Sequence, residues 1–314
     1  MSELNCEIPN GPAVSNAAIG GIGVLFSFFF TAVVSIVLSL TIIISEFRNK
    51  SSMLRRRLVS AYSDQQILLG IGIHSLGLAN RSTMIPYHFF IIWCLGLISQ
   101  AVHNAGLLSL VLNYRRDWVL RWLRQILMLT NMGLSVTYGV YILEAVKSGI
   151  EGQPIPIECA WQPGNGNSGS VGISFVGTIA VIVANAVVFI LASGFLHVRK
   201  VGRLRTFLKL GGVLLMGAVA VGAIIRCAWE ADAIGKGPAF EMDDGESTWS
   251  FGQVLSIIVL IFPLVSIVEI VRGDLHITPC DMSEGDGRTE ASTMELGNFQ
   301  PNPFFGSQTH LVKR

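Results

Sequence analysis

The chain alternates long apolar stretches with short polar linkers. A membrane-spanning helix needs about 20 mostly apolar residues, because each residue adds about 1.5 Å toward a hydrocarbon crossing of about 30 Å. Six stretches have this length, and a seventh is shorter and more polar. The seven stretches are 18–44, 65–79, 87–112, 123–143, 171–196, 208–229 and 251–271. The pattern predicts an all-α membrane protein, a bundle of seven transmembrane helices.

The distribution of basic residues decides whether the polar stretch 65–79 crosses the membrane. If it does, the linkers 45–63, 113–124 and 197–209 share one side and hold fourteen Lys and Arg, against three on the other side. If it does not, every later helix inverts and the two sides hold eight and nine. Lys and Arg gather on the cytoplasmic side of membrane proteins. We therefore predict seven spans, with the N-terminus outside or luminal and the C-terminus in the cytosol.

Composition supports this class and sets the domain limits. Apolar residues make up 51% of the chain and charged residues 14%, with a mean hydropathy of +0.57. The net charge of +1 gives no indication of a nucleic-acid partner. We predict an outer tail over 1–17, a transmembrane domain over 18–272 and a disordered cytosolic tail over 273–314, which is rich in polar residues and Gly. The expected location is the plasma membrane or an endomembrane.

Three of the five cysteines fall on or near the predicted outer side, where thiols can oxidise. They are Cys6, Cys159 and Cys227. We predict that Cys159 forms a disulfide with either Cys6 or Cys227, and the sequence leaves both pairings open.

Polar side chains at membrane depth are costly and therefore mark candidate sites. His74 and His103 lie at a similar depth, about ten residues from the predicted cytosolic ends of their helices. Asn104, Asn131 and Asn185 fall near the same level on the third, fourth and fifth predicted helices. The pattern predicts one polar cluster among the second to fifth helices. It would serve either as a ligand or proton site or as a hydrogen-bond network that orients the helices.

The run Ser63-Asp64-Gln65-Gln66 lies at the start of the second stretch. Ser is a common N-cap residue and an acid in the first turn interacts favourably with the helix dipole. We therefore expect the second helix to begin here.

The order of several motifs resembles a family of uncharacterised fungal multi-pass integral membrane proteins. The motifs are Ser63-Asp64-Gln65-Gln66, Tyr87-His88-Phe89 and then His103. The resemblance covers about residues 63–130, and it departs at Ser99-Gln100, where the family has two adjacent serines. It implies a fungal membrane protein without naming a reaction. It also implies that Asp64, Gln65, Gln66, His88 and His103 are candidates for a shared site.

These observations favour a receptor-like or accessory membrane protein without catalytic activity, whose partner is the lipid bilayer. The basic inner linkers would also attract anionic lipid, and a small-molecule ligand would fit a receptor. We predict no metal or cofactor, because no two histidines stand three to five residues apart, as zinc ligands on a helix often do. The alternative is a membrane-embedded enzyme of secondary metabolism such as an acid-driven cyclase, for which Asp64 and Glu269 are the available acids.

Overall fold

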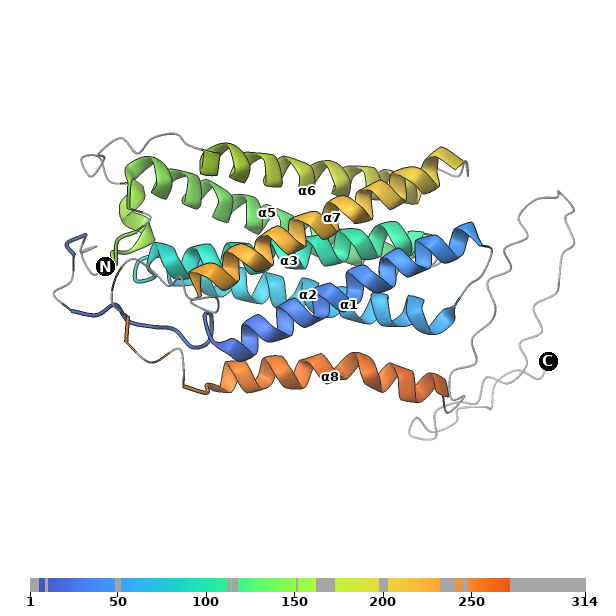
Figure 1. Ribbon diagram of the computed structural model, residues 1–314, viewed down its shortest axis with the longest axis horizontal. Coiled ribbons are helices and arrows are strands. Elements are labelled where there is room, and N and C mark those ends of the chain that lie inside the picture. Colours follow the sequence, from blue (N-terminus) through green and yellow to red (C-terminus); the bar gives the residue numbers. More distant parts are fainter. Residues whose placement is uncertain are drawn as a thin grey trace, which may run out of the picture. The chain divides into compact units, whose positions relative to one another are not determined.

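The structure, a computed structural model, describes residues 6–8, 11–48, 52–111, 114, 118–150, 152–161, 173–197, 203–231, 240, 242–243, 245 and 248–271. These residues form seven α-helices and one short 3₁₀ helix, η1 (Figure 1). The helices are α1 (Ile22–Phe47), α2 (Met53–Ala79), α3 (Pro86–Ser109), α5 (Trp118–Ser148), η1 (Ile157–Trp161), α6 (Ile173–His197), α7 (Arg203–Glu230) and α8 (Phe251–Val271). The predicted cytosolic tail, 273–314, lies outside the described residues.

The prediction of an all-α integral membrane protein is confirmed. Each α-helix runs antiparallel to the α-helix before it (Figure 1). Five helical segments are long and apolar enough to cross a bilayer: Ile22–Glu46, Pro86–Ser109, Arg121–Ser148, Phe175–Leu196 and Thr206–Glu230. A shorter apolar segment, Phe251–Val265, lies in α8. The more polar α2 packs alongside α1, α3, α5 and α8.

The expected start of the second helix is wrong. Helix α2 begins at Met53, and Ser63 and Asp64 lie in its interior. The added turns are amphipathic: Val59 is fully buried and Arg57 is exposed. A search for uniformly apolar stretches overlooks such turns, because one face of the helix carries the charges while the other packs on its neighbours.

Helix α3 is the centre of the bundle. It contacts α1, α2, α5, α6 and α7, and every residue of its membrane-spanning window is buried (Figure 1). In contrast, α6, α7 and α8 expose many Val, Leu, Ile and Phe side chains. Lipid is the environment that suits those outward faces, because in water they would form large apolar patches.

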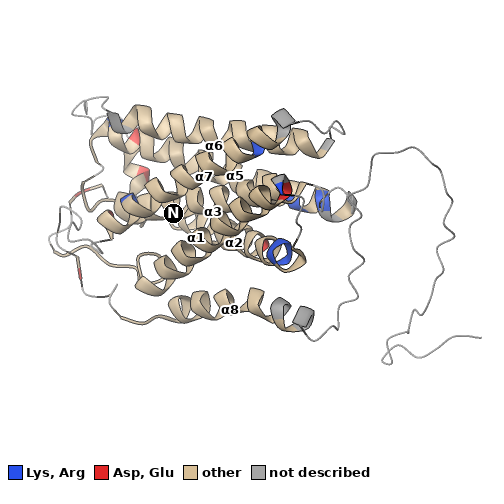
Figure 2. Cartoon of the chain, turned by 45° about the vertical axis from the view of Figure 1, so that its right-hand side comes forward, with Lys and Arg blue, Asp and Glu red and all other residues tan. Residues whose placement is uncertain are grey.

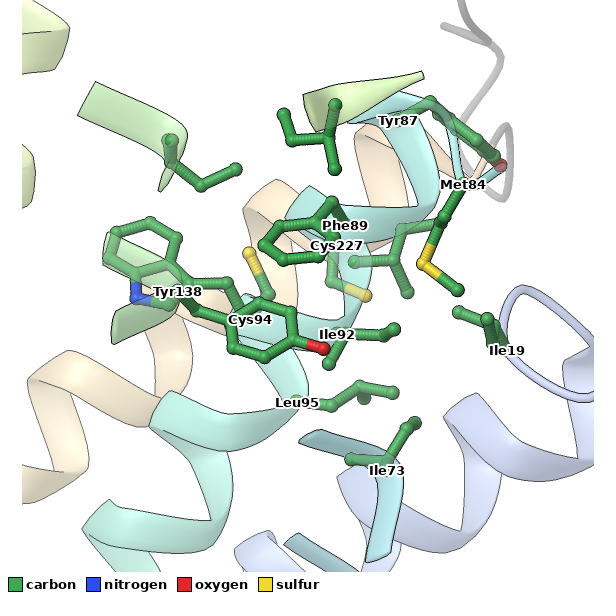
Figure 3. Close-up of a cluster of buried hydrophobic side chains, with 14 of the residues drawn as sticks. Ile19, Ile73, Met84, Tyr87, Phe89, Ile92, Cys94, Leu95, Tyr138 and Cys227 are labelled. Carbon is green, nitrogen blue, oxygen red and sulfur yellow. The ribbon is translucent and has the colours of Figure 1, made fainter. Parts of the chain in front are cut away.

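Apolar side chains fill the bundle on both sides of the polar middle of α3. Figure 3 shows one cluster, in which Phe89, Ile92 and Leu95 of α3 lie beside Tyr138 of α5. The Phe89 and Tyr138 rings stack with their centroids 4.0 Å apart. Such aromatic pairs add to the dispersion energy that holds helices together where lipid provides no hydrophobic driving force.

The two ends of the bundle differ in charge. Figure 2 shows most of the described Lys and Arg at the end where α2 and α7 begin, here called the basic end. At the other end, a disulfide joins Cys6 to Cys159 of η1, with their Cα atoms 5.8 Å apart; we call this the disulfide end. Cys227, the other partner allowed by the sequence, is a free, buried thiol in the cluster of Figure 3.

Further contacts tie the N-terminal segment to the disulfide end. The Asp243 backbone N–H donates to the carbonyl of Ala13 over 3.1 Å, and the Ser15 N–H donates to Asp243 Oδ1 over 3.0 Å. The Ser15 hydroxyl and the backbone N–H groups of Ser15 and Gly245 hold the pKa of the Asp243 carboxyl below its usual value. The charged carboxylate is therefore the form that fixes this segment.

Candidate functional site

A chain of buried hydrogen bonds crosses the middle of the bundle from α5 to α1. Asn131 of α5 donates to the Ser99 hydroxyl of α3 over 3.0 Å, and Ser99 donates to the carbonyl of Gln66 in α2 over 2.6 Å. The Gln66 amide then donates to the Thr31 hydroxyl of α1. Gln100 adds a bond of 3.4 Å to the carbonyl of Asn131. Four helices are thus linked through side chains that are fully or almost fully buried.

His74 lies about two turns beyond Gln66 along α2 and is held mainly by packing. Its ring meets the Tyr138 ring edge to face, with centroids 4.8 Å apart, and its carbonyl accepts a 2.8 Å bond from the Tyr138 hydroxyl. The imidazole also rests on the backbone of Gly96 in α3, where a Cβ atom would overlap the ring. Glycine at this position therefore lets α2 and α3 approach closely.

On another face of α3, Asn104 faces α6 and α7. Its amide nitrogen lies 3.5 Å from the carbonyl oxygen of Asn185 and 3.6 Å from the sulfur of Met216. Asn185 donates its own amide to the carbonyl of Val181, within α6. His103 is almost completely buried, and its Nδ1 atom has no hydrogen-bond partner among the residues that the structure describes.

Four of the five polar residues predicted to form one cluster lie against two different faces of α3. His74 and Asn131 lie on its α2–α5 side, and Asn104 and Asn185 lie on its α6–α7 side. The contacts of these four side chains thus fall on two faces of α3, and a site shared by all five residues stays a prediction. The bonds that are present join helices to one another, as expected of an orienting network.

The contact between His74 and Gly96 predicts a destabilised variant. Gly96→Ala places a methyl group against the imidazole and should cost about 1–3 kcal/mol, the usual effect of overpacking a core. Thermal unfolding of the purified protein in detergent measures the loss. Gly133→Ala in α5 is the matched control, because no atom lies within 4 Å of its added Cβ. Equal melting temperatures for the two variants would contradict the close packing of α2 on α3.

Asp64 belongs to an ion pair near the basic end. Arg124 of α5 donates through Nε to Asp64 Oδ1 over 2.7 Å, and its Nη2 donates to Asp64 Oδ2 and, over 2.9 Å, to the Ser60 hydroxyl. The guanidinium also lies over the Tyr114 ring, 4.5 Å from its centroid. This two-pronged geometry is the strongest form of a carboxylate–guanidinium contact. We call these four residues the Asp64 cluster.

The other residues of the family-like motifs lie elsewhere. The buried amide of Gln65 has no hydrogen-bond partner within the described part of the chain. His88 is buried at the start of α3, at the disulfide end, with its ring 4.9 Å from that of Tyr87. Asp64 and His88 therefore lie near opposite ends of the bundle, and the motif residues do not form one site.

A second ionic cluster joins α1, α2 and α7 near the basic end. Glu46 accepts from Arg56 over 3.2 Å and from Lys209 over 3.1 Å, each cation bonding a different carboxylate oxygen. The side chains of Arg56 and Lys209 are 8% and 7% exposed, and that of Glu46 is 15% exposed. We call these three residues the Glu46 cluster. It shields three charges from lipid and connects helices that are distant in sequence.

Sequence reasoning missed both ionic clusters. It treated Arg124, Arg56 and Lys209 as part of the charge bias that sets topology and of the basic linkers that attract anionic lipid, and assigned them no acidic partner. The signal that could have found them is an acid, Glu46 or Asp64, among linkers that are otherwise basic. An isolated carboxylate near the membrane boundary requires a cationic partner. The sequence does not show which of the many nearby Lys and Arg residues supplies it.

Within the described ranges, no three His, Cys, Asp or Glu side chains gather closely enough to hold a metal ion. No family model, no curated protein and no solved structure matches the chain. The resemblance to the fungal family therefore stays a prediction.

Proposed function

We propose that this chain is a receptor-like or accessory protein of a fungal membrane, without catalytic activity, and that its seven helices all span the bilayer. The observation that carries the proposal is the Asp64–Arg124 pair. The acid that an acid-driven cyclase would need is bound to a guanidinium. Both oxygens of the Asp64 carboxyl accept from the Arg124 guanidinium, so this acid serves a contact between α2 and α5. The side chain of Glu269, the other acid considered, lies outside the described residues.

Two features support an orientation with the N-terminus outside or luminal. Lys and Arg gather at the basic end, which is the cytoplasmic end by the positive-inside rule (Figure 2). The Cys6–Cys159 disulfide lies at the other end, and disulfides persist in oxidising compartments. Both features point to the same orientation.

The ionic clusters suit a protein that changes the positions of its helices. Both lie near the basic end, and together they connect α2 to α1, α5 and α7. Breaking an ion pair and forming another is a common way for a helix bundle to move between two states. The exposed side chain of Arg57 on the same end is available to anionic lipid.

Exchanging the charges of the Asp64–Arg124 pair tests this proposal. Asp64→Arg alone and Arg124→Asp alone place like charges together and should each lower the free energy of unfolding by about 1–3 kcal/mol. The double variant restores an ion pair and should recover most of that loss. Melting temperatures in detergent measure both effects.

The double variant also separates the receptor-like proposal from the cyclase. Its carboxylate sits on α5 instead of α2, so an enzyme that uses the Asp64 carboxyl would lose its product although the fold is intact. Cells that carry the double variant at the wild-type protein level should show an unchanged metabolite profile. The disappearance of a specific metabolite in those cells would overturn the proposal.

A further inference from the structure

A cavity of about 660 Å³ lies between α3, α6 and α7. Its walls include Phe90, Trp93 and Leu97 of α3, Val181 of α6, and Val219 and Arg226 of α7. Ligand pockets in proteins usually measure about 300–1,000 Å³ and are mostly apolar, with few polar groups. The cavity is separate from both ionic clusters and from the hydrogen-bond chain around Asn131.

The cavity opens toward lipid because α6 and α7 separate. The two helices lie close together near the linker that joins them and diverge toward the disulfide end (Figure 1). Gly177 of α6 and Gly222 of α7 line the cavity, and no atom outside its own stretch of helix lies within 4 Å of a Cβ added to either residue. These small residues therefore leave space that a larger side chain would fill.

One polar group of the lining indicates the chemistry of a ligand. Arg226 is the single charged residue of the lining, one turn before the end of the membrane-spanning segment Thr206–Glu230, and its guanidinium lies 5.7 Å from the centroid of the Phe90 ring. An anionic group in the cavity would therefore pair with this guanidinium.

We propose that this cavity binds a single-chain amphiphile with an anionic headgroup, a carboxylate or a phosphate, which enters sideways from the bilayer. The headgroup lies at Arg226, close to the membrane boundary, where a cation can reach the interfacial region. The hydrocarbon chain extends toward the membrane centre along Leu97, Val181 and Val219. A guanidinium is well suited to both headgroups because it pairs with carboxylate and phosphate oxygens.

The site is independent of the proposed function. It is built from α3, α6 and α7 near the disulfide end, whereas the Asp64 cluster lies near the basic end and involves α2 and α5. A bound amphiphile would give a receptor-like protein its ligand, but the binding test below does not use any receptor response. Failure of one proposal therefore leaves the other standing.

Photo-crosslinking to the full-length protein in lipid nanodiscs tests the site. The probe is an oleic acid that carries a diazirine in its chain, and labelled peptides are identified by mass spectrometry. Labels should concentrate on the α3, α6 and α7 residues that line the cavity. Unlabelled oleic acid and oleoyl lysophosphatidic acid compete as the carboxylate and phosphate arms. Oleyl alcohol and oleoyl lysophosphatidylcholine are the neutral and zwitterionic controls.

Leucine substitutions at glycine provide matched variants. Gly177→Leu with Gly222→Leu fills the cavity and should lower labelling by about tenfold or more, since the chain loses its space. Gly194→Leu with Gly211→Leu makes the same change on the same two helices outside the cavity, also with no atom within 4 Å of either added Cβ. This control pair should label like the wild type. Arg226→Gln should weaken competition by the acidic amphiphiles by about tenfold, as expected for a lost charged hydrogen bond.

Competition by either acidic amphiphile supports the site and identifies its preferred headgroup. Equal competition by oleyl alcohol or by the zwitterionic lipid would overturn it, because the headgroup charge would then have no role. Labels spread evenly over the outward faces of all helices, or equal loss in the two leucine pairs, would also overturn it. Those results are typical of ordinary lipid contact at the protein surface.

Discussion

Replacing Glu46 by alanine should destabilise the protein by about 3–5 kcal/mol, the usual cost of removing one member of a buried ion pair. Arg56 and Lys209 would both lose the carboxylate that they share, while each stays more than nine-tenths buried. The penalty arises mainly from two cations that remain away from water. Thermal and chemical unfolding in detergent would measure the loss.

Two controls identify the cause of this effect. Glu144→Ala removes an acid whose partner, Lys147, is 65% exposed, and such surface pairs contribute less than about 1 kcal/mol. Replacing Glu46, Arg56 and Lys209 together by leucine removes all three charges and should recover most of the lost stability. If the triple variant is as unstable as Glu46→Ala, the effect comes from lost packing and the electrostatic explanation is wrong.

Loss of the disulfide should have the second-largest effect. Cys6→Ser or Cys159→Ser removes a link between residues 153 apart in sequence and should cost about 2–5 kcal/mol. The cost arises because the link restricts the unfolded chain and ties the N-terminal segment to η1. A reducing agent should shift the melting temperature of the wild type by the same amount and leave the serine variants unchanged.

Mass spectrometry under non-reducing conditions checks the pairing directly. A cross-linked peptide pair that contains Cys6 and Cys159 is expected, with Cys94 and Cys227 open to alkylation after unfolding. Cys227→Ser is the matched control, since its thiol is not part of the bond. Alkylation of all five cysteines without reduction would contradict the disulfide.

The helices could be predicted from sequence because long apolar stretches have few alternatives. The predicted stretch 251–271 has the limits of α8, and 171–196 differs from α6 by only two residues at its start and one at its end. The start of α2 was wrong because Val59 and Tyr62 face the core while Arg57 faces outward. Mean hydropathy averages those faces and does not register their arrangement.

The candidate site could be predicted only as a set of buried polar residues. Depth along each helix can be counted from the sequence, and His74, Asn104 and Asn185 are indeed buried. Their partners depend on how each helix is rotated about its own axis. Asn104 faces Asn185 while Ser99, five residues earlier, faces α2 and α5. The sequence does not fix that rotation, because polar groups lie on several faces of α3.

The central place of α3 also bears on how the protein is made. α3 precedes α5, α6 and α7 in the chain, yet its mature surroundings include all three helices. During synthesis, Asn104 enters the membrane before Asn185 and Met216 exist. Until α6 and α7 are synthesised and inserted, the Asn104 amide is surrounded by lipid or by the membrane insertase. Hydrocarbon provides no hydrogen-bond partner for such a polar group. The helices of this bundle therefore pack together after they have been inserted. Packing is complete only when α5, α6 and α7 contact α3.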